Sequence, residues 1–197
     1  MRLFTNNIFF SVFGKSLDLS FDLNSAPPIL TALCAELEHR LEIEPSVLVP
    51  QLGKFFSESV SLNRNYQALE ERLSKVTPAE LPNLLREWQI EDIAASIRRY
   101  LRELPEPLIP TTLYDDFIEM GKLQIDSDAL LMMEKLIAKS LNVHHSRCVQ
   151  YFGSHLARIC RVVEKNGNGF DGEKILSHFY AMVFLRPPWE KFVYVLI

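Results

Sequence analysis

Residues 100–110 read Tyr-Leu-Arg-Glu-Leu-Pro-Glu-Pro-Leu-Ile-Pro, and this stretch decides the fold. Apolar residues within and before it recur at helical spacing, which predicts a core-facing helix over about residues 91–104 with Ile93, Ile97, Tyr100, Leu101 and Leu104 as its buried stripe. The prolines that follow end this helix, because proline lacks an N–H donor and restrains the residue before it. Leu108 and Ile109 are expected to turn back from the extended exit into the core.

Helical spacing also dominates the rest of the chain, and strand-like alternation is sparse after residue 24. Further helices are predicted to begin near residues 25, 64, 77, 112, 127 and 144, with a last helix after a loop at 166–169. Thr77-Pro78-Ala79-Glu80 has the pattern of a capping box, although Pro82 favours a later start or a bend. Gly121 is expected to end the helix before it in a left-handed conformation. The sum is a single multi-helix all-α domain.

The amino-acid composition of the chain limits the classes of partner that it is expected to bind. The chain has 197 residues, 48% hydrophobic and 23% charged, which is typical of one globular domain. A net charge of -4 argues against nucleic acid as the main partner, because phosphate binding usually requires a basic surplus. No apolar run approaches the length of a membrane span. The three cysteines lack framework spacing, so reduced, buried thiols of a cytosolic protein are expected.

The residues from Leu101 onward, LRELPEPLIP followed by TTLYDDF, closely resemble the signature of Rho GTPase-activating (BCR-homology) domains. Two further stretches, residues 26–38 and 175–191, resemble this domain as the class IA phosphoinositide 3-kinase regulatory subunit carries it. The resemblance covers about residues 25–192 and implies a Rho GTPase-activating-like domain there. Residues 1–24 are then an N-terminal arm or leader, and residues 193–197 begin a continuation.

The resemblance implies a catalytic arginine in the loop between the first two core helices, in the pattern Gly-x-Tyr/Phe-Arg-x-Ser/Pro-Gly. Its guanidinium offsets charge that builds on the phosphoryl oxygens in the transition state. The corresponding residues 47–59 contain no arginine. If Phe56 takes the aromatic position, Ser57 stands where the guanidinium belongs. Lys54 is the nearby cation, and it lacks the planar fork of arginine.

The family's second polar position, an asparagine of the late helix, falls on Val183, or on Met182 after a shift of one residue. The basic position of the signature helix persists as Arg98, four residues before Arg102 and on the side away from the apolar stripe. We therefore expect no catalytic residue, and Arg98, Arg102 and Lys54 become candidates for contact with a GTPase.

No cofactor or metal is predicted. His144 and Cys148 lie one helical turn apart without a second pair at metal-site spacing. The sequence also contains no Gly-rich phosphate loop and no dinucleotide fingerprint.

The expected function is a non-catalytic interaction module of a phosphoinositide 3-kinase regulatory subunit, which binds Rho-family GTPases without accelerating hydrolysis and is not an enzyme. The resemblance implies a lipid kinase catalytic subunit as a partner of the parent protein, and a cytoplasmic location with recruitment to membranes through partners. Two alternatives stay open. One is an active GTPase-activating protein that brings Lys54, Arg64 or Arg98 into the nucleotide pocket, and the other is a scaffolding or self-associating domain.

Overall fold

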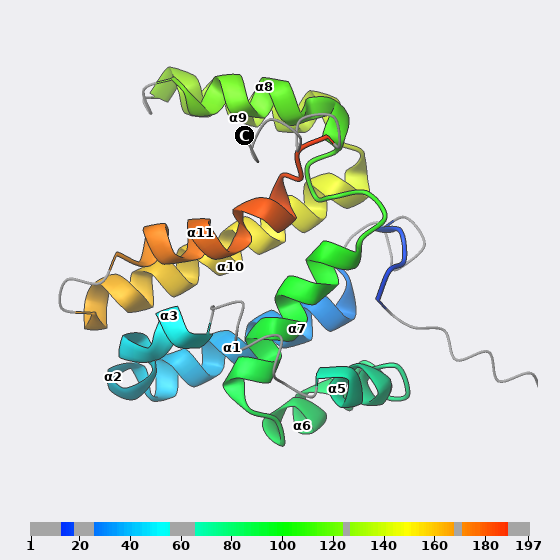
Figure 1. Cartoon of the computed structure of the whole chain (residues 1–197), viewed down its shortest axis with the longest axis vertical. Coiled ribbons are helices and arrows are strands. Elements are labelled where there is room, and N and C mark those ends of the chain that lie inside the picture. Colours follow the sequence, from blue (N-terminus) through cyan, green and yellow to red (C-terminus); the bar gives the residue numbers. More distant parts are fainter. Residues whose placement is uncertain (1–12, 18–25, 56–65, 124–126, 168–170, 189–197) are drawn as a thin grey trace, which may run out of the picture.

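The computed structural model of the chain describes residues 13–17, 26–55, 66–123, 127–167 and 171–188 (Figure 1). All regular elements of these residues are helices, which confirms the all-α fold. Their order is α1 (Pro28–Ile43), α2 (Pro45–Leu48), η2 (Val49–Gln51), α3 (Leu52–Phe55), α5 (Tyr66–Leu73), α6 (Leu81–Arg86), α7 (Ile90–Glu103), η3 (Thr111–Leu113), α8 (Tyr114–Gly121), α9 (Ser127–Ser140), α10 (Val143–Asn166) and α11 (Gly172–Phe184).

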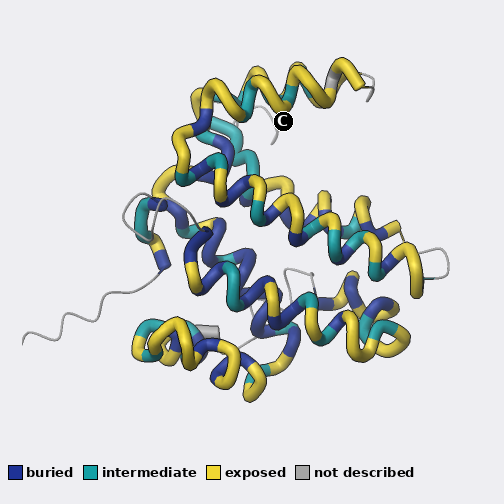
Figure 2. The backbone as a smooth tube through the Cα atoms, turned by 180° about the vertical axis from the view of Figure 1, so that it is seen from behind, coloured by how far each residue is buried: buried dark blue, intermediate teal, exposed yellow. Residues whose placement is uncertain are grey.

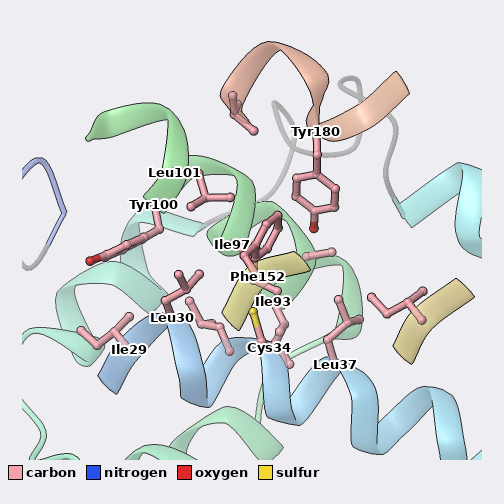
Figure 3. Packing of buried hydrophobic residues seen from close by; sticks show 14 of the residues in the cluster. Ile29, Leu30, Cys34, Leu37, Ile93, Ile97, Tyr100, Leu101, Phe152 and Tyr180 are labelled. Atoms are coloured by element: carbon pink, nitrogen blue, oxygen red, sulfur yellow. The ribbon is translucent and has the colours of Figure 1, made fainter. Parts of the chain in front are cut away.

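The core lies between two pairs of helices. α1 packs along α7, and α10 packs along α11; α1 also meets α10, and α7 also meets α11. Figure 3 shows Leu30, Cys34 and Leu37 of α1 facing Ile93, Ile97 and Leu101 of α7, with Phe152 of α10 and Tyr180 of α11 beside them. Each of these large apolar side chains stabilises the fold by about 1.5–3 kcal/mol when it leaves water.

The exit from α7 folds back as predicted. The whole predicted stripe of the helix is buried, and so are Leu108 and Ile109 beyond the prolines. The Ile109 N–H donates to the carbonyl oxygen of Phe184 over 3.1 Å, and Arg186 Nη2 donates to the carbonyl oxygen of Leu104 over 2.6 Å. Two long-range hydrogen bonds therefore hold the turn after α7 against the end of α11.

Two local predictions need comment. The backbone N–H and the hydroxyl of Thr77 donate to Glu80 Oε2 over 2.8 and 2.7 Å, yet α6 begins only at Leu81, because Pro82 fits the first turn of a helix. The prediction for Gly121 is wrong: this glycine is the last residue of α8, and Lys122 after it keeps helical angles. Among the described residues, only Gly14 has a positive φ, of 74°.

The described part of the N-terminal segment is packed on the domain. Phe13 and Leu17 are buried, and the ring of Phe13 meets that of Tyr100 edge to face, with the centroids 5.7 Å apart. The prediction for residues 1–12 and 18–24 falls outside the described residues.

Burial is uneven over the molecule. Figure 2 shows buried backbone concentrated along α1 and α7, while the hairpin of α8 and α9 at one end is mostly exposed. α10 and α11 are intermediate, with one face on the core and the other in solvent.

Candidate functional site

The C-terminal end of α7 carries the best-defined candidate residues. Glu91 and Asp92 lie in the first turn of this helix and Arg102 lies in its last turn, an arrangement that suits the helix dipole. The helix ends where Leu104 turns extended, with φ -54° and ψ 131° before Pro105. Because the exit is held against α11, the exposed side chain of Arg102 stands on a fixed support.

Arg98 is a buried residue and not a surface residue. Its side chain is buried between α7 and α11, where Nε donates to the Phe179 carbonyl oxygen over 3.2 Å. Its guanidinium carbon lies 4.8 Å from the centroid of the Phe179 ring. The sequence analysis placed Arg98 on the side of the helix away from the apolar stripe, and in the structure α11 covers this residue. Arg98 therefore holds two helices together and does not face solvent.

A neighbouring arginine that the sequence analysis did not single out also connects helices. Arg99 is half-buried and forms ion pairs with Glu70 of α5 over 3.1 Å and with Glu103 over 2.7 Å. The pair with Glu103 has the i, i+4 spacing that stabilises a helix, which was a readable signal in the sequence. α5 is thereby held to the side of α7.

The remaining predicted positions are dispersed. Val183 is 1% exposed and belongs to the core, whereas Met182 beside it is 49% exposed. Lys54 is exposed on α3, which packs against α7. Ser57 and Arg64 lie outside the described residues. The structure thus brings Arg98 to α11 and places Arg102 and Lys54 on the surface of different helices.

A charged cluster that the sequence analysis missed joins α1 to α10. Nδ1 of the fully buried His155 lies 2.6 Å from Glu38 Oε1, and Arg158 donates to both oxygens of Glu38 from Nε over 2.6 Å and from Nη2 over 3.0 Å. Because the imidazole sits against a carboxylate oxygen, we assign its Nδ1 as the donor. From the sequence, only the spacing that places His155 and Arg158 on one face of a helix could be recognised. Their partner Glu38 is more than a hundred residues away in the chain.

The pKa values of this cluster follow from burial and pairing. Burial lowers the pKa of His155 and outweighs the opposite effect of Glu38. Burial alone would raise the pKa of Glu38, but the hydrogen bonds from His155 and Arg158 outweigh it and hold this pKa below its ordinary value. The stable arrangement at neutral pH is therefore a neutral imidazole and an ionised carboxylate.

The described residues contain neither a candidate metal site nor a candidate membrane span. They contain no group of three or more His, Cys, Asp or Glu side chains that could hold a metal ion. Among their helices, none has both the length and the apolar character of a membrane span.

Comparison with known proteins identifies the family. The model of the RhoGAP domain family matches residues 59–184, which is more than half of the chain, so this chain belongs to the RhoGAP domain family. The matched part begins after Ser57 and includes the whole of α7 and its exit.

Three relatives show the range of similarity. The chain is 26% identical to Probable Rho-type GTPase-activating protein 3 of Schizosaccharomyces pombe over 175 residues, 84% of this chain and 18% of the relative. It is 27% identical to GTPase-activating protein CdGAPr of Drosophila melanogaster over 128 residues, 64% of this chain and 7% of the relative. With Rho GTPase-activating protein 25 of Mus musculus it shares 28% identity over 131 residues, 63% of this chain and 18% of the relative. The chain thus spans less than a fifth of the length of each.

These relatives correct one prediction. The expectation that the chain is not an enzyme is contradicted, because its relatives are named as GTPase-activating proteins. That expectation rested on two missing polar residues, the loop arginine and the asparagine of the late helix. The family match does not include Ser57, where the arginine was sought, but it does include Val183.

Proposed function

We propose that this chain is a GTPase-activating domain for Rho-family GTPases, which binds their GTP-bound form and accelerates hydrolysis. Membership of the RhoGAP family carries the proposal, together with relatives that are named for this activity. The supporting feature of the fold is the end of α7, where hydrogen bonds hold the backbone that follows the exposed Arg102. Charge complementarity at an interface contributes to the specificity and the rate of protein–protein recognition.

In this proposal, a basic side chain outside the expected loop position supplies the positive charge that offsets the charge on the phosphoryl oxygens in the transition state. Arg98 is unsuited to this role, because its guanidinium is buried on the ring and the carbonyl of Phe179. Arg102 is exposed and offers the planar guanidinium that matches phosphoryl oxygens, whereas Lys54 offers a point charge. We therefore favour Arg102 as the side chain that reaches the GTPase, with Lys54 as the second choice.

A single-turnover assay tests the proposal. The purified chain is mixed with GTP-loaded members of the Rho family, and phosphate release is followed. Because an arginine delivered to the nucleotide raises the rate by about 10³ to 10⁵, a chain with a substitute side chain should still accelerate at least one GTPase by about a hundredfold or more. Binding of the GTP-loaded proteins without any acceleration would count against the proposal.

Variants of the chain assign the basic residue. Arg102→Ala is expected to lose most of the acceleration. Arg147→Ala, which changes another exposed arginine, on α10, should keep it. Lys54→Ala is the parallel test for the second choice. If Arg102→Ala retains full activity and Lys54→Ala loses it, the choice between the two side chains reverses.

A finer proposal concerns the parent protein. We propose a regulatory subunit of the phosphoinositide 3-kinase type, cytoplasmic and recruited to membranes through partners, with the domain over residues 25–192. Support comes from residues 26–38 and 175–191, which form much of α1 and α11 and resemble that subunit type. Co-purification of the full-length parent with a lipid kinase catalytic subunit tests this. Absence of the kinase from the purified parent would reject the subunit type and leave the GTPase-activating proposal intact.

A further inference from the structure

The hairpin of α8 and α9 carries an uncovered apolar surface. No described side chain of these two helices is buried, although large apolar residues are present. We define the hairpin patch as the exposed residues Ile118, Leu123, Leu130 and Leu131. Met132 is also exposed, but it lies about 200° around α9 from Leu130 and is not part of the patch. Single exposed apolar side chains are ordinary, but several on one pair of helices mark a surface that is covered by something. Figure 2 shows how far this hairpin stands out as exposed from the rest of the molecule.

The apolar face of α9 runs past the edge of the core. Ile137 is partly buried and packs against the core cluster. Met133 and Leu130 lie four and seven residues before it, so they share its face of the helix. Met133 is half-buried, but Leu130 is 59% exposed. The face that meets the core at the end of α9 is therefore uncovered near the start of this helix.

We propose that residues 189–197 of this chain, Trp-Glu-Lys-Phe-Val-Tyr-Val-Leu-Ile, dock on the hairpin patch. These residues lie outside the described part of the chain, and three observations single them out. The first is position: Ile109, two residues before η3 begins, donates its N–H to the carbonyl oxygen of Phe184 over 3.1 Å. The chain thus leaves α11 beside the root of the hairpin.

The second observation is reach. Nine extended residues span about 30 Å, because each adds about 3.3 Å. The 14 residues of α9 rise about 21 Å along the helix axis. The segment after Pro188 is therefore long enough to run along the whole hairpin.

The third observation is composition. Seven of these nine residues are hydrophobic, and the charges of Glu190 and Lys191 cancel. Burial of apolar surface stabilises by about 25 cal/mol per Å², on the segment and on the patch alike. The neutral segment brings no uncompensated net charge onto an apolar surface. A second copy of the chain, or a partner protein, is the competing occupant, and the experiment below separates them.

Tryptophan fluorescence tests the proposal on the full chain. The chain contains two tryptophans, Trp88 and Trp189, so a Trp88→Phe background leaves Trp189 as the reporter. Docking predicts a blue-shifted emission for Trp189 and slow cleavage by trypsin after Lys191. Leu130→Asp and Leu131→Asp are each expected to shift the emission to that of a water-exposed tryptophan and to speed the cleavage.

The matched control is Val47→Asp, because Val47 is 52% exposed on α2 outside the hairpin patch. It should leave both signals unchanged. All three substitutions replace exposed side chains, so circular dichroism and the melting temperature should confirm that each variant is folded. A chain ending at residue 188 should bind more of a hydrophobic dye than the full chain does, and Leu131→Asp should lower that binding.

Two results overturn the proposal. One is a water-exposed emission of Trp189 in the unsubstituted background, or a shifted emission that the hairpin variants leave unchanged. The other is a dimer in light scattering that Leu131→Asp dissolves without any change in Trp189 emission, because a second copy then covers the patch. Neither result bears on GTP hydrolysis, which is measured separately.

Discussion

The guanidinium carbon of Arg98 lies 4.8 Å from the ring centroid of Phe179, and Nε of the same side chain donates to the Phe179 carbonyl oxygen. This pair fixes α11 to α7 through a residue that the sequence analysis placed on the side of the helix away from the apolar stripe. Arg102, one turn further along α7, is exposed. Two arginines of one helix thus have separate roles, one in holding the fold and one on the surface.

Substitution of these two arginines should separate stability from activity. Arg98→Ala removes a hydrogen bond from a charged donor and its stacking on an aromatic ring, so the free energy of unfolding should fall by about 2–3 kcal/mol. Arg102→Ala should change it by less than about 0.5 kcal/mol while lowering GTPase acceleration. Urea unfolding and single-turnover hydrolysis measure the two effects. Equal destabilisation by both substitutions would contradict this division.

Acidification should destabilise the fold through the cluster of Glu38, His155 and Arg158. Because burial depresses the pKa of His155 in the folded state, the unfolded chain takes up this proton first as the pH falls below about 6.5. Glu38, whose folded pKa is also lowered, adds a loss of stability at pH values below about 4.5. The free energy of unfolding should therefore decrease from pH 7 to pH 5, by up to about 1.4 kcal/mol per pH unit from His155.

His155→Gln is the variant that tests this assignment. The amide does not titrate, so unfolding free energies measured from pH 7 to pH 5 should show a smaller slope, although the variant is less stable overall. His178→Gln on α11 is the control, because this histidine is exposed. An unchanged slope in His155→Gln would show that another group causes the acid sensitivity.

Substitution of alanine for two of the glycines should change the free energy of unfolding in opposite directions. A Cβ on Gly172, at the start of α11, would lie 3.0 Å from Cγ1 of Val163, a fully buried side chain of α10. Gly172→Ala should therefore lower the free energy of unfolding by about 1–3 kcal/mol, as overpacking does. Around Gly153, inside α10, a Cβ meets nothing within 4 Å, so Gly153→Ala should raise it by up to about 1 kcal/mol. Thermal unfolding of both variants compares these signs directly.

The cysteines should react in two groups. All three thiols are free; Cys34 and Cys148 are fully buried, and Cys160 is partly exposed. Burial raises the pKa of Cys148 to about 12 and that of Cys34 well above its ordinary value, so neither presents a thiolate at neutral pH. Mass spectrometry after treatment with a thiol reagent should find label on Cys160 alone until denaturant is added. Label on Cys34 in the native protein would reveal local opening between α1 and α10.

Much of the fold could be predicted because its signals are local. The stripe of α7 and the prolines after it fixed both the helix and its exit, and Leu108 and Ile109 are buried as expected. The environment of Arg98 could not be predicted, since periodicity shows which side of a helix is polar but not which neighbour covers it. Glu38 and His155 lie 117 residues apart, a separation that no local pattern bridges. The expectation that the chain is not an enzyme rested on two polar positions of the family that the sequence does not retain, and the relatives named as GTPase-activating proteins contradict it.

The hydrogen bond from Arg186 to Leu104 joins residues 82 positions apart. A protein is synthesised from its N-terminus to its C-terminus. The hydrogen bond to Leu104 therefore cannot form until α11 and the residues after it have been synthesised. Contacts between distant residues also form slowly, because a long loop must close before they contribute. The signature of the family, although nearly central in the sequence, is thus among the last parts of the domain to mature, and a product cut short before Arg186 would leave the Leu104 carbonyl without its donor.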